Sequence, residues 1–271
     1  MRRIVACLLV LLLLVGCGSN TTEQKDESNV LRVGMECDYA PFNWSTVEAG
    51  EFSQPLNEVD YCDGYDVVMA TRIADELGME VQIVKLEWDA LIPALTNGEI
   101  DLIIAGMTDT PLRRESGVAF TTPYYESQMT VIVKADSDLV NITDIQELSG
   151  RIVEGQLGTT YDEVIDQING VIHADAKEAY PAMIPDLQYG IVDAITAELP
   201  VAIGICSANP DLAYVTFAEG KGFVVDTSVS IGVDARNEEL LNKVQGVLDG
   251  ISEDERLQIM LAATDRQPAN D

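Results

Sequence analysis

The sequence is poor in basic residues and in histidine. Its 271 residues include 16 Lys and Arg against 46 Asp and Glu, with one histidine and a formal net charge of −30. Because a nucleic-acid-binding protein needs a basic face to neutralise phosphates, this balance argues against that class of partner. One histidine and five scattered cysteines also argue against a zinc finger, a multi-histidine metal site and an iron–sulfur cluster. No metal and no cofactor is therefore predicted.

Long apolar runs are also missing, with one exception at the N-terminus. Residues 1–17 read MRRIVACLLVLLLLVGC, in which two arginines precede an apolar run that ends at Gly16-Cys17. The run is shorter than the roughly 20 residues of a spanning helix, which is typical of a signal peptide. Its end resembles a bacterial lipobox, which implies that residues 1–16 are removed and that Cys17 is lipidated. An ordinary transmembrane anchor and a signal cleaved elsewhere are the alternatives.

The polar residues that follow predict a flexible tether, so residues 17–29 are expected to be a lipidated cysteine and its linker. An exported protein can keep disulfides. Cys37 and Cys62 flank the loop-rich stretch 43–63, so a disulfide between them is one alternative and two free thiols are the other, because sequence does not fix connectivity. Cys206 ends an apolar run and is expected to be a buried thiol.

The rest of the chain alternates strand and helix patterns in two blocks. Hydrophobic residues make up 47% and charged residues 23%, which is ordinary for a chain that buries a core, and the length allows one or two domains. Periodicity and turn signals predict an α/β protein with mostly parallel sheets. Strands are expected at 31–35, 81–86, 101–105, 130–134, 151–154, 192–196 and 223–233. Helices are expected at 66–77, 90–97 (with Asp89 as N-cap), 143–148, 160–168, 177–189, 198–206, 237–249 and 252–263. Ligands bind such sheets beyond the carboxyl ends of the strands.

Eight short motifs follow these predicted strand ends: 36–44, 64–66, 87–95, 98–101, 105–113, 120–125, 156–160 and 193–198. In this order they resemble the bacterial family 3 extracellular solute-binding proteins, the amino-acid-binding components of ABC importers, from residue 30 to about 262. The resemblance implies a two-lobed periplasmic-binding-protein-like fold of type II, with two hinge strands and a ligand cleft between the lobes. Lobe 1 would hold residues 30–124 and 222–271, and lobe 2 residues 125–221.

The resemblance also implies how the backbone of a free L-amino acid is held. Arg113 aligns with the arginine that takes the carboxylate, and a guanidinium can fork onto a carboxylate through two parallel hydrogen bonds. Thr108 and Thr160 align with further carboxylate contacts. The carbonyl of Gly106 and the side chain of Glu198 align with groups that hold the ammonium. The plainer alternatives are a surface arginine, a helix N-cap at Thr160 and a solvated acid at the start of a helix.

Five further residues align with positions around the ligand side chain. Tyr39 and Trp88 align with an aromatic pair, whose faces would attract a cation; core packing is the alternative for both. Glu36 aligns with an acid at the far end of the ligand, Gln156 with a lining position, and Met107 is expected against the ligand stem. An acid beside two aromatic rings favours a basic amino acid such as arginine, lysine, ornithine or histidine, with glutamine as the alternative.

The functional expectation is a binding component without enzymatic activity. Its partners would be a free amino acid and an ABC permease, with no nucleic acid, with membrane contact only through the lipid, and as a monomer. One alternative is a dehydratase-like enzyme on the same fold that uses Glu36 and Glu198; another is a sensory ectodomain. The sequence holds no G-x-S-x-G or H-E-x-x-H motif. His173 lies outside every motif and is expected on the surface of lobe 2. The stretch 43–63 is longer than the family's usual loop.

Overall fold

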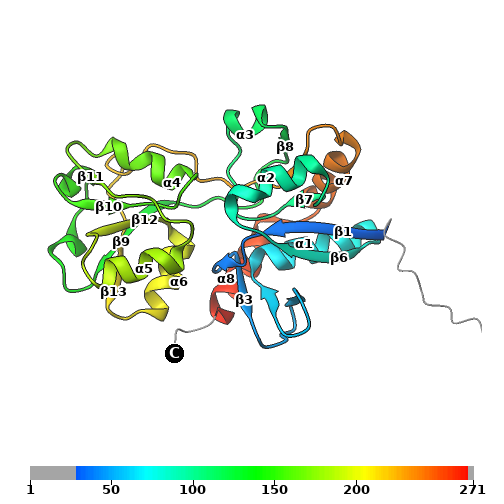
Figure 1. Ribbon diagram of the computed structural model, residues 1–271, viewed down its shortest axis with the longest axis horizontal. Coiled ribbons are helices and arrows are strands. Elements are labelled where there is room, and N and C mark those ends of the chain that lie inside the picture. The colour runs from blue at the N-terminus through cyan, green and yellow to red at the C-terminus, as the bar shows by residue number, and fades with distance from the viewer. Residues whose placement is uncertain (1–28, 268–271) are drawn as a thin grey trace, which may run out of the picture.

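The computed structural model describes residues 29–267. The predicted signal peptide, Cys17 and nearly all of the tether lie outside these residues. Two five-stranded sheets form two lobes that lie side by side and are joined by two connecting segments (Figure 1). Across residues 29–267, none of the helices combines the length and the apolar character needed to cross a membrane.

The first sheet forms the core of lobe 1. Its strand order is β6-β1-β7-β14-β8, with β1 parallel to β6 and β7, and β14 antiparallel to β7 and β8. The strands are β1 (Val30–Met35), β6 (Glu80–Lys85), β7 (Leu102–Ile103), β8 (Val118–Phe120) and β14 (Gly232–Asp234), and the helices are α1 (Tyr65–Leu77), α2 (Trp88–Asn97), α3 (Pro111–Glu115), α7 (Glu238–Asp249) and α8 (Glu253–Arg266).

The second sheet has a matching arrangement in lobe 2. Its order is β11-β10-β12-β9-β13, with β10 parallel to β11 and β12, and β9 antiparallel to β12 and β13. Its elements are β9 (Met129–Lys134), β10 (Ile152–Glu154), β11 (Ile172–His173), β12 (Ala194–Glu198), β13 (Leu212–Val215), α4 (Thr160–Glu163), α5 (Tyr180–Gln188) and α6 (Leu199–Ala208), with 3-10 turns η2 (Asp138–Asn141), η3 (Ile145–Leu148) and η4 (Val164–Gln167).

The chain crosses between the sheets twice, and the two crossing segments pair with each other. The N–H of Tyr124 donates to the carbonyl of Val229 at 2.9 Å, and the N–H of Val229 donates to the carbonyl of Tyr125 at 2.9 Å. The second crossing returns the chain from lobe 2 to β14, α7 and α8 beside the first sheet (Figure 1). The residue limits given above for the two lobes stay a prediction.

The long stretch 43–63 folds into a small sheet on lobe 1. Strands β2 (Asp38–Tyr39), β3 (Asn43–Thr46), β5 (Tyr61–Asp63) and β4 (Gln54–Pro55) pair in that order. Arg266 of α8 holds this sheet in two ways. Its Nη2 lies 2.9 Å from Asp63 Oδ1, and its guanidinium covers the Phe52 ring at 4.5 Å from the centroid.

Several local expectations need correction. Helix α2 begins at Trp88 with Glu87 as N-cap, so Asp89 lies in the first turn instead of at the cap. Helix α5 begins at Tyr180, because Pro181 fits best in a first turn where its missing N–H leaves no bond unmade. Only 232–233 of the predicted strand 223–233 belong to a strand, β14, and only 102–103 of the predicted strand 101–105 do, in β7.

The cysteines do not form the disulfide that was one of the two alternatives. Cys37 and Cys62 are buried free thiols in the structure, so the disulfide is not formed there, although the two thiols lie within hydrogen-bonding reach of each other. Cys62 Sγ lies 3.6 Å from Met35 Sδ. Cys206 is a free thiol that is only partly buried, where a buried one was expected.

Candidate functional site

A cavity between the lobes lies at the strand ends where the sequence motifs fall. Eleven residues line it. Lobe 1 contributes seven lining residues and lobe 2 contributes four: Glu36, Tyr39, Trp88, Ala105, Gly106, Thr108 and Arg113, with Gln156, Thr159, Thr160 and Tyr161. Eight of the ten residues predicted from the sequence therefore line one cavity. Met107 and Glu198 are not among the lining residues.

The two lobes touch directly across this cavity. Gln156 Nε2 donates to Glu36 Oε1 at 2.9 Å, and Trp88 Nε1 donates to the carbonyl of Gly158 at 3.1 Å. The Tyr39 hydroxyl of lobe 1 donates to Glu198 Oε1 of lobe 2. The structure is thus a closed arrangement, in which lobe 2 covers the strand ends of lobe 1.

Arg113 is a buried cation in the wall of the cavity. It is only 9% exposed, and its Nη1 donates to the carbonyl of Thr108 at 2.6 Å. The guanidinium lies 5.1 Å from the centroid of the Trp88 ring. Within residues 29–267 no carboxylate forms an ion pair with it, whereas its exposed neighbour Arg114 pairs with Asp109. Burial lowers the pKa of Arg113, which remains a cation at neutral pH. A buried charge is costly unless it is paired, so this guanidinium favours the binding of an anion.

Glu198 lies directly behind the cavity wall. Two lining residues, Tyr39 and Tyr161, donate their hydroxyls to its Oε1, the second at 2.9 Å. Its other carboxylate oxygen, Oε2, is buried and has no hydrogen-bond partner among the described residues. Burial raises the pKa of Glu198 to about 7, against the lowering effect of the hydroxyls of Tyr39, Tyr161 and Ser127. Glu198 thus contacts the cavity through the Tyr39 and Tyr161 hydroxyls and does not line it itself.

Glu36 is the second buried acid and lies at the cavity surface, 6% exposed. Burial, followed by repulsion from Asp38, raises its pKa to about 8, while the hydrogen bond from Gln156 lowers it. Glu87 and Asp89 raise the pKa further. A carboxyl group under these conditions gains from a cationic partner, because the partner offsets both the burial and the repulsion.

The two predicted aromatic residues have partners of their own. The Tyr39 ring stacks on Phe42 at a centroid distance of 5.3 Å and on Tyr180 of lobe 2 at 5.6 Å. The face of Trp88 carries Arg113. Phe42 and Trp44 are buried in the core of lobe 1. That Tyr39 and Trp88 sandwich a ligand side chain stays a prediction.

Gly106 brings the backbone of lobe 1 to the cavity in a conformation that only glycine adopts easily. Its φ is +59°, and a Cβ at this position would lie 2.8 Å from Tyr39 Cε1. Thr108, two residues later, is buried beside Arg113. On the opposite lobe, Thr159 is the N-cap of α4, with its Oγ1 accepting from the N–H of Tyr161 at 3.2 Å. Thr160 is therefore the first helical residue and not the cap.

Some residues were missed and one was misplaced. Tyr161, Thr159 and Ala105 line the cavity although only their neighbours were singled out; each is one residue from a predicted site residue. Met107 was expected against the ligand but is buried in the core, and its carbonyl accepts from the N–H of Ser230 at 2.8 Å.

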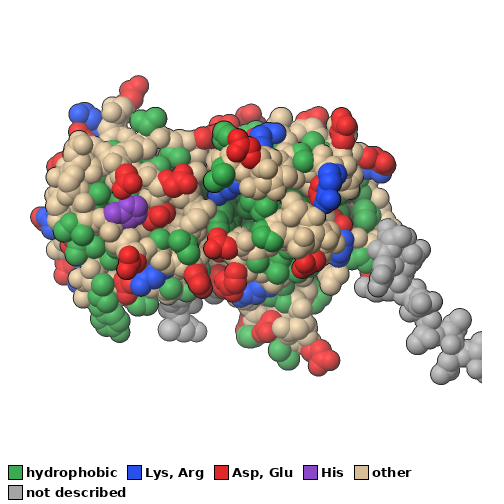
Figure 2. All heavy atoms as spheres, turned by 45° about the horizontal axis from the view of Figure 1, so that its top comes forward, with side chains coloured by type: hydrophobic (Ala, Val, Ile, Leu, Met, Phe, Trp, Pro, Cys, Tyr) green, Lys and Arg blue, Asp and Glu red, His purple; other side chains and the backbone are tan. Residues whose placement is uncertain are grey.

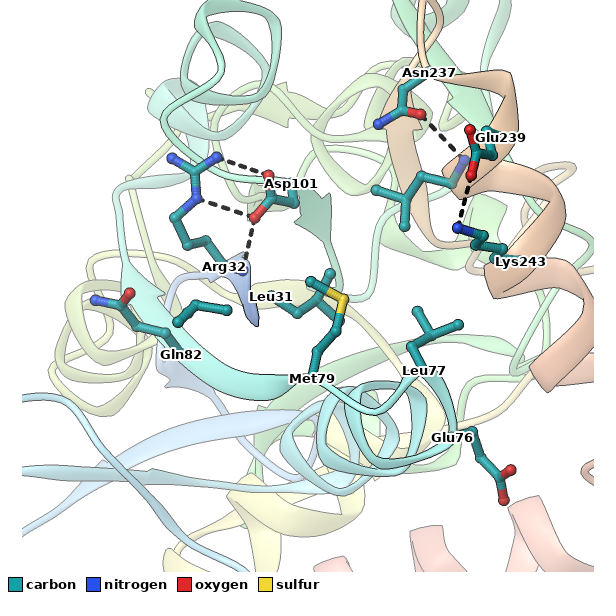
Figure 3. Close-up of a pocket in the computed structure, with 12 residues that line it drawn as sticks. Leu31, Arg32, Glu76, Leu77, Met79, Gln82, Asp101, Asn237, Glu239 and Lys243 are labelled. Carbon is teal, nitrogen blue, oxygen red and sulfur yellow. Dashed lines mark hydrogen bonds and ion pairs between the residues drawn. The ribbon is translucent and has the colours of Figure 1, made fainter. Parts of the chain in front are cut away.

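A second cavity lies elsewhere, at the end of lobe 1 where the described residues begin (Figure 3). Four of its five charged side chains pair with one another, and the fifth, Glu76, lies 3.5 Å from Arg72 outside the cavity. Arg32 forks onto Asp101, and Lys243 Nζ lies 2.7 Å from Glu239. Because its charged side chains already have ion-pair partners, this cavity is the weaker candidate for the functional site.

Other surface features lie apart from the cavity. Acidic side chains are spread over both lobes (Figure 2). His173 is on the surface of lobe 2, as expected, with its ring nitrogens 2.8 Å and 3.0 Å from Asp162 and Asp166. Among residues 29–267, no three His, Cys, Asp or Glu side chains gather in a way that could hold a metal ion.

Comparison with known proteins agrees with this geometry. The family model of the bacterial extracellular solute-binding proteins, family 3, matches residues 31–262. A probable histidine-binding protein of Campylobacter jejuni is 32% identical over 219 residues, which cover 78% of this chain and 79% of that protein.

Solved structures give the same result. The amino acid ABC transporter substrate-binding protein AbpA of Streptococcus pneumoniae, bound to L-arginine, has a TM-score of 0.76 and 28% identity over 88% of this chain and 95% of that one. An ancestral arginine-binding protein bound to glutamine has a TM-score of 0.71 and 29% identity over 85% and 96%. The motifs, the two-lobed fold and the family match over most of its length show that this chain belongs to the bacterial extracellular solute-binding proteins, family 3.

Proposed function

We propose that this protein is the substrate-binding component of an ABC importer and that it binds a basic L-amino acid between its lobes. The observation that carries the proposal is the state of Arg113, a buried guanidinium in the cavity wall with no carboxylate partner among the described residues. The ligand carboxylate is the anion that completes it. A fork of two charge-assisted hydrogen bonds from Arg113 would also fix the orientation of that carboxylate.

The other end of the amino-acid backbone then meets acceptors. The ammonium lies toward the carbonyl of Gly106 and toward Glu198, whose Oε2 is buried without a partner. Thr108 of lobe 1 and Thr160 of lobe 2 add hydrogen-bond donors for the carboxylate. A zwitterion is thus complementary to this part of the cavity, with a cation facing its carboxylate and an acid facing its ammonium.

The side chain of the ligand extends toward Glu36. A cationic tail suits this position, because Glu36 is buried and is repelled by Asp38, Glu87 and Asp89. The histidine- and arginine-binding relatives agree with a basic ligand. Glutamine is the second candidate, because its amide can donate to Glu36, and the glutamine-bound ancestral protein shows a related cavity accepting it.

Ligand binding would stabilise the closed arrangement, because one molecule contacts both lobes. Residues from lobe 1 and from lobe 2 line the same cavity, so neither lobe alone offers the complete set of contacts. The tail of the ligand replaces Gln156 as a partner of Glu36, so the present contact at 2.9 Å is one that the ligand exchanges.

The remaining expectations belong to this proposal. The protein acts without catalysis, as a monomer, outside the cytoplasm, and delivers its ligand to a permease in the membrane. Cys17 carries a lipid that anchors it. Support comes from the lipobox-like end of the apolar run and from relatives that are named as transporter binding proteins.

Calorimetry with three related ligands tests the proposal. L-Citrulline has nearly the shape of L-arginine with a neutral tail, and agmatine is arginine without its carboxylate. L-Arginine is expected to bind at least about tenfold more tightly than either, since each analogue lacks one charge pair worth about 1.4 kcal/mol or more. Equal affinity for L-citrulline would overturn the basic ligand, and equal affinity for agmatine would overturn the role of Arg113.

A further inference from the structure

A buried carboxylate outside the cavity is connected to both of the lobe 1 loops that line it. Asp66 lies in the first turn of α1 and is 0% exposed. Its Oδ1 accepts from the Tyr124 hydroxyl at 2.7 Å, and its Oδ2 accepts from Asn43 Nδ2 at 2.8 Å. Tyr124 and Asn43 are also fully buried.

Each of these two donors is itself bonded to the main chain of a binding loop. The N–H of Gly106 donates to the Tyr124 hydroxyl oxygen at 3.0 Å. The N–H of Cys37 donates to Asn43 Oδ1 at 2.7 Å. Two hydrogen-bond chains therefore start at the strand ends after β7 and β1 and converge on Asp66.

The direction of these chains requires a carboxylate at their meeting point. Main-chain N–H groups can only donate, so Tyr124 and Asn43 receive at one end and donate at the other. Asp66 must then accept at both oxygens, which an ionised carboxylate does and an amide cannot. With an amide at position 66, one chain would face a donor and lose a buried hydrogen bond.

The main chain at both starting points has an unusual conformation. Gly106 has φ +59°, and Cys37 has φ +56°, a left-handed conformation that is uncommon for a residue with a side chain. Cys37 lies between Glu36 and Tyr39, and the carbonyl of Gly106 faces the proposed ammonium position. The hydrogen bonds from their N–H groups hold both conformations in place.

We propose that Asp66 is a positioning residue for the binding cleft, which fixes the two lobe 1 loops that present Glu36, Tyr39 and Gly106 to the ligand. This inference rests on the proposed function for the identity of the ligand, but not for the geometry of the loops. Tyr124 extends the connection, because its main-chain N–H pairs with Val229 where the chain crosses between the lobes. Burial raises the pKa of Asp66 to about 7, so the ionised form that accepts from both chains predominates above about pH 7.

The first test uses hydrogen–deuterium exchange on the full-length, ligand-free protein in detergent. Asp66→Asn is compared with Ile73→Ala, a buried change in the same helix that leaves the network intact. Peptides that contain Cys37 and Gly106 are expected to exchange at least tenfold faster in Asp66→Asn than in Ile73→Ala at an equal margin below each variant's Tm. Equal exchange in the two variants would overturn the proposal.

A second variant keeps the test decisive if Asp66→Asn does not fold. Tyr124→Phe removes the hydroxyl that joins Gly106 to Asp66 and leaves the Asn43 chain complete. Faster exchange is expected for the peptide with Gly106 and unchanged exchange for the peptide with Cys37. An equal increase in exchange in both peptides would contradict two separate hydrogen-bond chains.

Binding of L-arginine supplies the functional readout. Asp66→Asn is expected to weaken it at least tenfold relative to Ile73→Ala. Combining Asp66→Asn with Asn43→Asp exchanges acid and amide, so that every donor again meets an acceptor, and this double variant is expected to recover most of the loss. No recovery would overturn the proposal. If the wild-type protein does not bind L-arginine, the proposed ligand is wrong, while the exchange experiment still tests Asp66.

Discussion

Gln156 of lobe 2 donates a hydrogen bond to Glu36 of lobe 1 across the cleft, at 2.9 Å. The two residues lie 120 positions apart in the chain, and both line the cavity. The contact places the acid that would meet the ligand tail against the opposite lobe. A cationic tail that replaces Gln156 at Glu36 would therefore change a contact between the lobes and would also determine which ligand is preferred.

Removal of the Arg113 guanidinium should abolish most binding. Arg113→Ala leaves the ligand carboxylate without its cation, which should weaken binding by about 2–5 kcal/mol. Arg114→Ala is the matched control, because Arg114 is exposed and pairs with Asp109. Calorimetry should show a loss for the first variant only. Normal binding by Arg113→Ala would mean that the carboxylate lies elsewhere.

Affinity for a basic ligand should increase with pH. The pKa of Glu36 is raised to about 8 by burial and by Asp38, Glu87 and Asp89. A bound cation favours the ionised form of Glu36. Below pH 8, binding therefore requires Glu36 to release a proton, so affinity for L-arginine should rise as the pH increases from 6 to 8. Glu198, with a pKa of about 7, affects every amino acid alike, so L-arginine should depend on pH more steeply than L-glutamine. Glu36→Gln should remove that difference; a difference that persists would exclude Glu36 as its source.

The same raised values predict the stability of the ligand-free protein. Glu36, Asp66 and Glu198 have pKa values of about 8, 7 and 7, each above its usual value near 4. Between about pH 4 and 8 the folded chain thus binds more protons than the unfolded chain, so stability should fall as the pH rises through this range. Thermal unfolding at pH 5 and pH 8 without ligand tests the sign. A higher Tm at pH 8 would show that other groups dominate.

Gly106 and Gly78 form a matched pair of substitutions. Both have left-handed φ angles, +59° and +69°, but a Cβ at Gly106 would meet the Tyr39 ring at 2.8 Å, whereas a Cβ at Gly78 meets nothing within 4 Å. Gly78→Ala should cost about 1–2 kcal/mol of stability from its backbone conformation alone, and Gly106→Ala should cost more, because the added Cβ also displaces the Tyr39 ring. Only Gly106→Ala should also weaken ligand binding, as measured by calorimetry. Equal effects of both variants on binding would remove Gly106 from the site.

Membrane attachment can be tested separately from binding. Cys17→Ala should move the protein from the membrane fraction to the soluble fraction after cell lysis, because the lipid attachment point is lost. Cys7→Ala, within the same apolar segment, should leave attachment unchanged. Continued anchoring of Cys17→Ala would contradict the lipobox.

Much of the fold and of the cavity follows from local patterns. A helix at 66–77 was predicted and α1 spans Tyr65–Leu77, with Val67, Ala70, Ile73 and Ala74 buried along one face and Gly78 ending it in a left-handed conformation. Motifs at strand ends converge because parallel strands end at the same edge of a sheet, which is why eight predicted residues line one cavity.

The remainder depends on contacts that no local pattern encodes. Met107 lies between two cavity residues, but whether it faces the cavity or the core is set by packing. Glu198 contacts the cavity through Tyr39, which is 159 positions away. Asp66 was visible within a motif, yet its partners Asn43 and Tyr124 are 23 and 58 positions away. The single reversed strand in each sheet, β14 and β9, also depends on the long-range return of the chain.

The most direct test of the central claim is thermal unfolding of residues 18–271 with each of the twenty amino acids, ornithine and citrulline. A ligand that binds only the folded state raises its stability by about 2.7 kcal/mol at a hundredfold excess over Kd. The account predicts a large rise in Tm with one or more of arginine, lysine, ornithine and histidine, and none with glutamate. No rise with any compound in the set would contradict an amino-acid-binding cleft, and a rise with glutamate alone would contradict the role given to Glu36.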